Sequence, residues 1–497
     1  MKTLANMLQK FCIAALILIS PTSKGSSQDT AMSLSLKIDQ LLTSYHNLNR
    51  LNGVVLVAQN GETILSKGYG SASIEWNIPN APEVKYLIGS ITKPFTATLI
   101  MQLIDQGKLK LDTRLSDLLP WYRRDVAEKV TVFQLLNHTS GIPNYLDLKS
   151  RSMDGLTLEF GTAVVDKIEF ARNFCSADLI FDPGTKWAYN NSAYFLLALI
   201  VEQVTKKPFH VALSEMIFQP LQMTGSGDLQ PNPEQVVEKL ATGYVKTPDG
   251  FNHMHYWNFS TALGAGSIYA TTGDLLKFDQ ALNSGSFLSA KAKEAMFTPG
   301  LNGYGCGWEL REVPLGKNSE IRKIQTHEGF VRAWHARYYR IPEDGYCIVI
   351  FSNTGDSPLE KMFSGITDVL YGRIPVFPKP SLREAVGKKY KTDGIDQAIE
   401  YGKSLVEADF NAWETQENEL NSMGYQLLNS GLRDEAVKIF QWNTELHPQS
   451  WNVWDSYGEG LAKAGKKQSA IEAYQKSIKL NPENYGGTEM LKKLQAD

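Results

Sequence analysis

One stretch of this sequence, GSITKPFTATLIMQLIDQGKLKLD at residues 89–112, constrains the fold more than any other. Its apolar residues, among them Phe95, Leu99 and Leu103, recur at the spacing of one helix face. A helix with so apolar a face has to be buried, so it should run through the core of a large domain. The chain of 497 residues, 43% of them apolar, is long enough for such a core and for a further domain.

Ser90 lies at the predicted start of this helix, and Lys93 follows one turn later on the same side. Unpaired N–H groups and the helix dipole favour negative charge at such a start. A buried lysine can lose its proton near neutral pH and then accept the proton of a serine. The pair indicates either a nucleophile with its base or a capping serine followed by a surface lysine. These residues alone leave both interpretations open.

The N-terminus has the pattern of an export signal. Lys2 and Lys10 precede an apolar run at 11–19, and small polar residues follow this run. The run is too short to span a bilayer comfortably, and no other long apolar segment follows. We expect a signal peptide at residues 1–27, cleaved near Ser27, and a periplasmic or secreted protein. An uncleaved anchor is the alternative.

Charge and cysteine content exclude several classes of protein. The net charge is −3, with basic and acidic residues interspersed, so nothing favours nucleic acid as a partner. Cys175, Cys306 and Cys347 remain after cleavage, too few for a disulfide framework, and at most one bridge can form. The His-Met-His stretch at 253–255 lacks a third ligand at a recognisable spacing, so we expect no metal and no cofactor.

Tyr189 and Asn191 lie in the loop FDPGTKWAYNN, before an apolar helix. The phenol would transfer protons if nearby cations lowered its pKa, and the amide would bind a substrate carbonyl and orient Lys93. The Y-x-N pattern also occurs at Tyr45 and Tyr256, so a structural tyrosine is the simpler interpretation of this pattern alone.

Patterns typical of strands, turns and helix ends occur in the sequence before and after the loop that contains Tyr189. GVVLVAQ and ETILSKGYG flank Asn60 and Gly61, which predicts a hairpin. The Gly-rich stretch GYGCGWEL around Trp308 suits a cleft lining or a tight corner of a sheet. His138, at the end of a predicted helix closed by His-Thr-Ser-Gly, is interpreted as a capping or loop-fixing residue rather than as a catalytic base.

The stretch IQTHEGFVRAWHARYYRIPEDGYCIVIFSN predicts two strands joined by the turn EDG. His327 lies in the first strand, and Gly329 would let the backbone approach a ligand closely. The N–H of Phe330 would join that of Ser90 as a pair of oxyanion donors. A single histidine on a strand is more often structural, and this alternative stays open.

Like residues recur with one spacing of 34 near the C-terminus. This spacing, the small residues and the closing proline resemble tetratricopeptide repeats, in which each unit is two helices. Two units cannot bury a core alone, so they should lean on the segment 394–409 or on the catalytic domain. We expect helical repeats at 394–497 after a linker at 374–393, serving as a stabilising appendage or as a groove for a protein or peptide partner. The pairs are Gly424/Gly458, Leu427/Leu461, Gly431/Gly465, Ala436/Ala470, Phe440/Tyr474, Leu446/Leu480 and Pro448/Pro482.

Taken in order, the motifs GSITK, LLNHTSGIP, FDPGTKWAYNN, YGCGW and HEG resemble those of the penicillin-recognising serine hydrolases. The most similar branch contains class C β-lactamases, D-alanyl-D-alanine carboxypeptidases, D-aminopeptidases and related carboxylesterases. The resemblance covers roughly residues 34–372. It implies an α+β domain at 28–373, in which helices flank an antiparallel sheet and a helical lobe is inserted.

The resemblance also implies an acyl-enzyme that water resolves. One departure matters: His-Glu-Gly stands where class C β-lactamases have Lys-Thr-Gly, whose cation helps to hold a substrate carboxylate. Strong β-lactam hydrolysis is therefore less expected than peptidase, amidase or esterase activity. By position, the implied roles are nucleophile for Ser90, base or proton relay for Lys93, second proton-transfer group for Tyr189, substrate and lysine orienter for Asn191, and substrate-binding strand for His327 and Gly329.

We thus expect an extracytoplasmic serine hydrolase that cleaves an amide or ester, namely a D-amino-acid peptide, a β-lactam or a carboxylic ester. The alternative is a catalytically silent, penicillin-binding-like protein that recruits a partner through its repeats. The presence of Ser90, Lys93 and Tyr189 together favours the enzyme.

Overall fold

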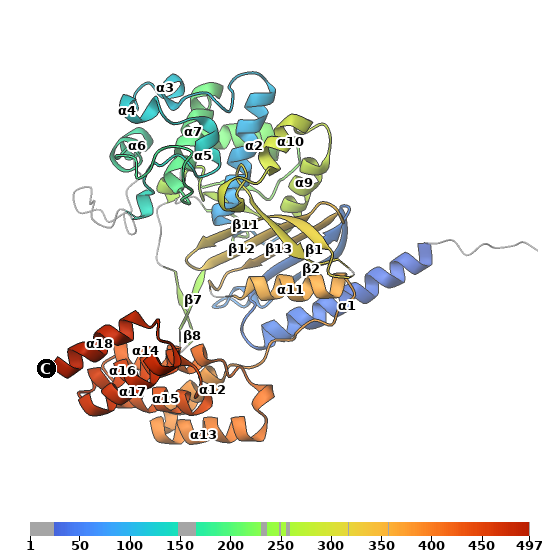
Figure 1. Ribbon diagram of the computed structural model, residues 1–497. Coiled ribbons are helices and arrows are strands. Elements are labelled where there is room, and N and C mark those ends of the chain that lie inside the picture. The colour runs from blue at the N-terminus through green and yellow to red at the C-terminus, as the bar shows by residue number, and fades with distance from the viewer. Residues whose placement is uncertain are drawn as a thin grey trace, which may run out of the picture.

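The computed structural model describes residues 24–147, 166–229, 236–247, 250–254, 259–316, 318–355 and 357–496. Within these ranges the chain forms an antiparallel sheet with helices on both faces, a helical lobe and a separate C-terminal helical domain (Figure 1). This is the expected α+β architecture. The signal peptide expected at 1–27 lies outside the described residues except for 24–27, where helix α1 (Lys24–Asn47) begins.

The main sheet has six strands in the order β10-β11-β12-β13-β1-β2, and all neighbours are antiparallel. Asn60 and Gly61 join β1 to β2 with φ angles of 51° and 82°, which confirms the predicted hairpin. The strands are β1 (Gly53–Gln59), β2 (Glu62–Tyr69), β10 (Glu309–Pro314), β11 (Ile321–Val331), β12 (Trp334–Ile341) and β13 (Tyr346–Ser352).

The stretch predicted to form two strands forms three, β11, β12 and β13. β11 turns directly into β12 at Arg332 and Ala333, with Val331 paired to Trp334. Arg332 adopts a left-handed φ of 46°. This tight turn contains none of the Gly, Pro, Asn or Asp residues that normally mark a turn in a sequence. The sequence therefore predicted only the later turn, between β12 and β13.

Alternating side chains give the sheet two cores. Val55 and Val57 of β1 pack in a cluster with residues of α1 and α11 (Leu359–Leu370). Val54 and Leu56 belong instead to the larger cluster, which contains the helices of the lobe. Figure 1 shows α1 and α11 on one side of the sheet and α2, α9 and α10 on the other. The second face therefore meets the helical lobe.

The helix expected to cross the core, α2 (Thr92–Asp105), does so: Phe95 and Leu99 have no exposed surface. The equally buried α7 (Asn191–Thr205) packs against it. The other helices on this side of the sheet are α3 (Leu115–Leu118), α4 (Arg124–Ala127), α5 (Val132–Leu136), α6 (Lys167–Phe174), α8 (Phe209–Leu213), α9 (Thr272–Asn283) and α10 (Ala290–Phe297).

Three small sheets complete the domain. They pair β3 (Ser71–Ser73) with β4 (Ile78–Pro79), β9 (Ile268–Ala270) with both β5 (Tyr86–Leu87) and β6 (Gly227–Asp228), and β7 (Tyr244–Thr247) with β8 (Gly250–His253). Of the histidines once considered as metal ligands, His253 ends β8 and His255 lies outside the described residues. Cys175, Cys306 and Cys347 are buried free thiols. None of the described helices combines the length and apolarity of a membrane span.

Two consecutive helix pairs account for the 34-residue spacing. Gly424 explains why a small residue recurs, because a Cβ there would lie 2.4 Å from the ring of Phe440. At the equivalent Gly458, a Cβ would lie 3.1 Å from the ring of Tyr474. The same close helix contact is thus built twice. The pairs are α14 (Glu417–Asn429) with α15 (Arg433–Leu446) and α16 (Trp451–Lys463) with α17 (Lys467–Leu480), followed by α18 (Tyr485–Ala496).

The interval 374–393, expected to be a linker, is helical over much of its length. Ser381 caps α12 (Leu382–Asp393), which contacts both α13 (Ile395–Ala408) and α14. The helical domain therefore begins near Ser381, and 374–380 is the part of the interval without a helix.

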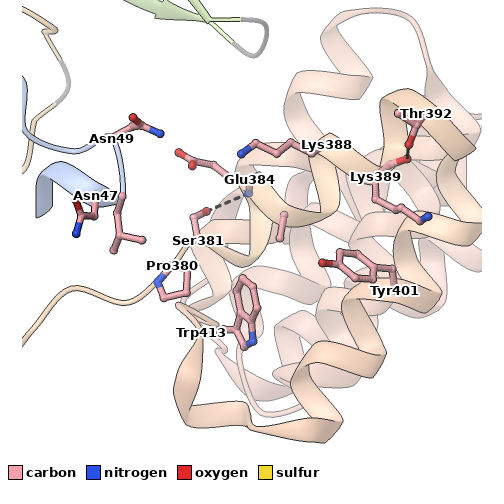
Figure 2. A pocket seen from close by; sticks show the side chains of 12 residues that line it. Asn47, Asn49, Pro380, Ser381, Glu384, Lys388, Lys389, Thr392, Tyr401 and Trp413 are labelled. Atoms are coloured by element: carbon pink, nitrogen blue, oxygen red, sulfur yellow. Dashed lines mark hydrogen bonds between the residues drawn. The ribbon is translucent and has the colours of Figure 1, made fainter. Parts of the chain in front are cut away.

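Ion pairs join the helical domain to the sheet domain. Arg50 donates two hydrogen bonds to Glu414, at 2.7 and 2.9 Å, and Lys246 of β7 contacts Glu384 of α12 at 2.8 Å. A groove of about 670 Å³ runs along this joint. Figure 2 shows its walls, which include Asn47 and Asn49 of the sheet domain and Pro380, Lys388, Tyr401 and Trp413 of the helical domain.

Candidate active site

Ser90 lies in a 3₁₀ turn, Gly89–Ile91, that runs directly into α2. Pro94 is compatible with the first turn of α2 because the N–H groups there have no helical partner. Gly89 has a left-handed φ of 50°, and a Cβ added to it would lie 2.9 Å from the backbone nitrogen of Phe330. The turn thus holds Ser90 between the lobe and the strand β11.

Lys93 is fully buried, and its amine contacts three oxygens. These are Oγ of Ser90 at 3.0 Å, Oδ1 of Asn191 at 2.8 Å and the carbonyl oxygen of Ala265 at 2.9 Å. Burial lowers the pKa of Lys93 well below its ordinary value. A neutral amine has two hydrogens and one lone pair. Because the amide and carbonyl oxygens can only accept, they take the hydrogens, and the lone pair is left for the Ser90 hydroxyl.

Tyr189 lies just before α7, with its ring centroid 4.8 Å from Nζ of Lys93 and its hydroxyl near Ser90. Burial raises the pKa of Tyr189, and the neighbouring Ser90 hydroxyl offsets only part of that rise. The lowering of this pKa by nearby cations, which was the condition set for proton transfer, is therefore not met. A neutral phenol can still accept one proton while it donates another, so the arrangement suits a relay.

Asn191, the first residue of α7, places its side-chain oxygen on Lys93. Oδ1 of Asn144 accepts the backbone N–H of Asn191 at 3.2 Å and contacts its side-chain nitrogen at 3.4 Å. These contacts leave the Asn191 oxygen facing the lysine. The geometry fits the expected role in orienting Lys93.

Strand β11 passes close to the Ser90 turn at Gly329. A Cβ on Gly329 would lie 1.8 Å from the carbonyl oxygen of Ile88, so only glycine fits. Phe330 contributes through its backbone, whose nitrogen lies beside Gly89 as an oxyanion donor near Ser90 requires. Its side chain is 54% exposed and packs against His335.

His327 is buried, and both of its ring nitrogens are already bonded. Nδ1 donates to the carbonyl oxygen of Glu328 at 2.7 Å, which places the proton of a neutral ring on Nδ1. Nε2 therefore accepts the hydroxyl of Tyr304 at 2.9 Å. Burial lowers the pKa of His327 to about 4. His327 is thus neutral near pH 7 and has no free nitrogen for a substrate carboxylate.

The carboxylate of Glu328 bonds to His335 at 2.6 Å and to Arg337 at 2.8 Å, both on β12. Because side chains alternate along a strand, Glu328 and His327 lie on opposite faces of the sheet. The charged network around Glu328 therefore supports the sheet from the face opposite His327.

Tyr304 and Ala265 contact the site but were not singled out from the sequence. Tyr304 belongs to the Gly-rich stretch, where a Cβ on Gly307 would lie 2.7 Å from Cβ of Ala97 on α2. The glycines of this stretch predicted a close approach of the backbone to another segment. They did not predict which residue bonds to the Tyr304 hydroxyl. Ala265 acts through its carbonyl oxygen, which any residue type provides, so the sequence holds no signal for it.

Known proteins resemble this chain over the sheet domain and the lobe. The family model described as Beta-lactamase matches residues 38–368. Penicillin-binding protein 4* of Bacillus subtilis (strain 168) is 28% identical over 392 residues, which cover 75% of this chain and 83% of that protein. Teichoic acid D-alanine hydrolase of Staphylococcus aureus is 26% identical over 318 residues, 64% of this chain and 73% of that one. The crystal structure of a penicillin-binding protein from Bacillus halodurans has a TM-score of 0.54 and 26% identity, covering 67% of this chain and 98% of that one.

Proposed function

This chain belongs to the beta-lactamase family of serine hydrolases, and from that premise we propose that it cleaves an amide or ester through an acyl-enzyme on Ser90. The observation that carries the proposal is the 3.0 Å contact between Oγ of Ser90 and the buried amine of Lys93. That contact joins a hydroxyl to a base whose pKa burial has lowered.

In the proposed acylation, Lys93 accepts the hydroxyl proton while Oγ of Ser90 bonds to the carbonyl carbon of the substrate. The carbonyl oxygen becomes an oxyanion, which the backbone N–H groups of Ser90 and Phe330 stabilise. Tyr189 donates its proton to the departing amine or alcohol and takes the proton held by Lys93. Water then attacks the acyl carbonyl carbon and gives one proton to these same groups. They pass that proton to Oγ of Ser90 as its bond to the acyl carbon breaks, and the acid leaves.

The preferred substrate in this proposal carries no carboxylate beside the scissile bond. His327 is neutral, and protein atoms occupy both of its nitrogens, so the strand offers no cation at this position. An acyl ester or amide, such as one of D-alanine, suits this site better than a free D-alanyl-D-alanine terminus. A relative named for the hydrolysis of D-alanine from teichoic acid supports an ester of this type.

A matched pair of peptides tests the preference. D-alanyl-D-alaninamide should be cleaved with a higher kcat/KM than D-alanyl-D-alanine, about 10- to 100-fold, because a missing charge-assisted hydrogen bond costs the carboxylate ligand ~1.5–3 kcal/mol. Steady-state kinetics on the purified mature chain give both values, with nitrocefin as a second carboxylate-bearing substrate. Faster cleavage of the free acid would contradict the preference. In the companion variant His327→Lys, the kcat/KM values for the two peptides should lie closer together.

The location and the helical domain complete the proposal. The protein acts outside the cytoplasm, a placement supported by the charged, apolar and small-residue zones at 1–27. The C-terminal helices present a surface to a protein or peptide partner. Exposed aromatic residues on these helices, Trp451 at 39% and Tyr485 at 79%, support that role.

Shortening the chain to 28–373 should leave kcat/KM for a small ester unchanged, because no residue of the helical domain contacts Ser90 or Lys93 among the described residues. Kinetics of the short and full chains, with melting temperatures for both, check this expectation. A folded short chain that had lost activity would show that the helices serve catalysis. The full chain with Arg50→Ala is the control for the loss of the joint with Glu414.

A further inference from the structure

His138 follows helix α5 and lies buried beside the candidate catalytic residues, with 1% of its surface exposed. Its φ of 62° is left-handed, which is uncommon for a residue with a Cβ. The centroid of its ring is 4.6 Å from that of Tyr189 and 4.5 Å from that of Tyr304. A buried histidine in this conformation has to be held by specific contacts.

Those contacts lie on both sides of Tyr189. The carbonyl oxygen of His138 accepts the backbone N–H of Ala188 at 3.0 Å. Its ring nitrogen Nδ1 accepts the backbone N–H of Asn190 at 3.1 Å. One residue therefore holds the chain immediately before and immediately after the tyrosine. With the backbone fixed on both sides, the phenol has little freedom to leave Ser90.

The imidazole has to be neutral to accept at Nδ1. Burial lowers the pKa of His138 well below its ordinary value. The single proton of the neutral ring is then on Nε2. Nε2 is buried and has no hydrogen-bond partner among the described residues. The hydrogen bond from Asn190 therefore orients the ring. Packing against the neighbouring aromatic rings also holds it in place.

We propose that His138 is a positioning residue for acyl transfer, which holds Tyr189 so that its hydroxyl stays within reach of Ser90 and Lys93. The inference rests on the proposed function, because His138 acts only through the tyrosine. It exchanges no proton itself, since the lone pair of its neutral ring is occupied by the N–H of Asn190.

Two substitutions separate the hydrogen bond from the ring. His138→Phe keeps a ring and removes the acceptor. His138→Asn keeps a side-chain oxygen near the place of Nδ1 and tolerates the left-handed backbone. Each is made in the full chain, alone and together with Tyr189→Phe, and kcat and KM are measured with a p-nitrophenyl ester. Near-ultraviolet circular dichroism and melting temperature report whether each variant folds.

We expect His138→Phe to lower kcat about 10²-fold with little change in KM, the size of loss that a displaced catalytic group causes. His138→Asn should retain more activity than His138→Phe. In the Tyr189→Phe background neither substitution should cause a further loss, because the group that His138 positions is already absent.

Equal losses in both backgrounds would overturn the inference, as would an unchanged kcat in a folded His138→Phe variant. If His138→Phe does not fold, the comparison of His138→Asn in the two backgrounds decides in the same way. Full activity of Tyr189→Phe alone would count against the proposed proton relay as well. Additive losses would count against His138 only, so the two failures can be told apart.

Discussion

Ser90→Ala is expected to lower kcat on the order of 10⁴- to 10⁶-fold, because it removes the proposed nucleophile and leaves only binding and oxyanion stabilisation. The same variant should lose covalent labelling by a fluorophosphonate probe, which intact-protein mass spectrometry detects as an added mass on the wild type. Kinetics with an activated ester give the loss of kcat.

A second buried serine provides the matched control for this variant. Ser140 lies in the same lobe, is 1% exposed, and its hydroxyl accepts the backbone N–H of Ile142 at 3.3 Å. Ser140→Ala should keep both labelling and hydrolysis, whereas Ser90→Ala should keep only its fold and melting temperature. Labelling that persists in Ser90→Ala would place the nucleophile elsewhere.

Lys93→Met is expected to lower kcat/KM by ~10²–10⁴-fold, because it removes the proposed base for the Ser90 proton while filling a similar volume. The oxygens of Asn191 and Ala265 lose their donor in this variant. Each buried acceptor left unpaired costs ~1–3 kcal/mol, so the melting temperature should fall as well. Activity is therefore compared below the transition of the variant, where both proteins are folded.

The pH profile shows whether Lys93 is the base. The active form has a neutral amine, so kcat/KM should rise with pH through the lowered pKa of Lys93 and reach a plateau above it. Burial raises the pKa of Tyr189. Ionisation of this phenol should therefore not reduce activity at any pH below 10.0, the ordinary pKa of tyrosine. In Lys93→Met the rising limb should disappear. If that variant kept the same limb, the titrating base would be another residue.

Local patterns predicted much of the fold. The turn residues Asn60 and Gly61 predicted the first hairpin, and the apolar face after Ser90 predicted the buried helix α2. The spacing between Gly424 and Gly458 predicted two similar helix pairs. These features rest on residue types at fixed short spacings, which a sequence displays directly.

Other features leave no such trace. The β11–β12 turn uses Arg332 and Ala333, residues without turn preference, and the expected linker contains α12 because that helix finds partners in α13 and α14. The pKa of Tyr189 depends on how deeply the phenol is buried, which nearby letters in the sequence do not report.

By itself, the sequence supplied the candidate reactive groups, the order of the motifs and the helical repeat, because these depend on residue type and spacing. Tertiary structure alone decided that burial lowers the pKa of Lys93 beside Ser90, that His327 offers no free nitrogen, and that His138 holds both neighbours of Tyr189. The physical reason is that burial and hydrogen-bond partners come from segments far apart in the chain. The protonation state of a side chain therefore depends on its environment in the folded protein as well as on its residue type.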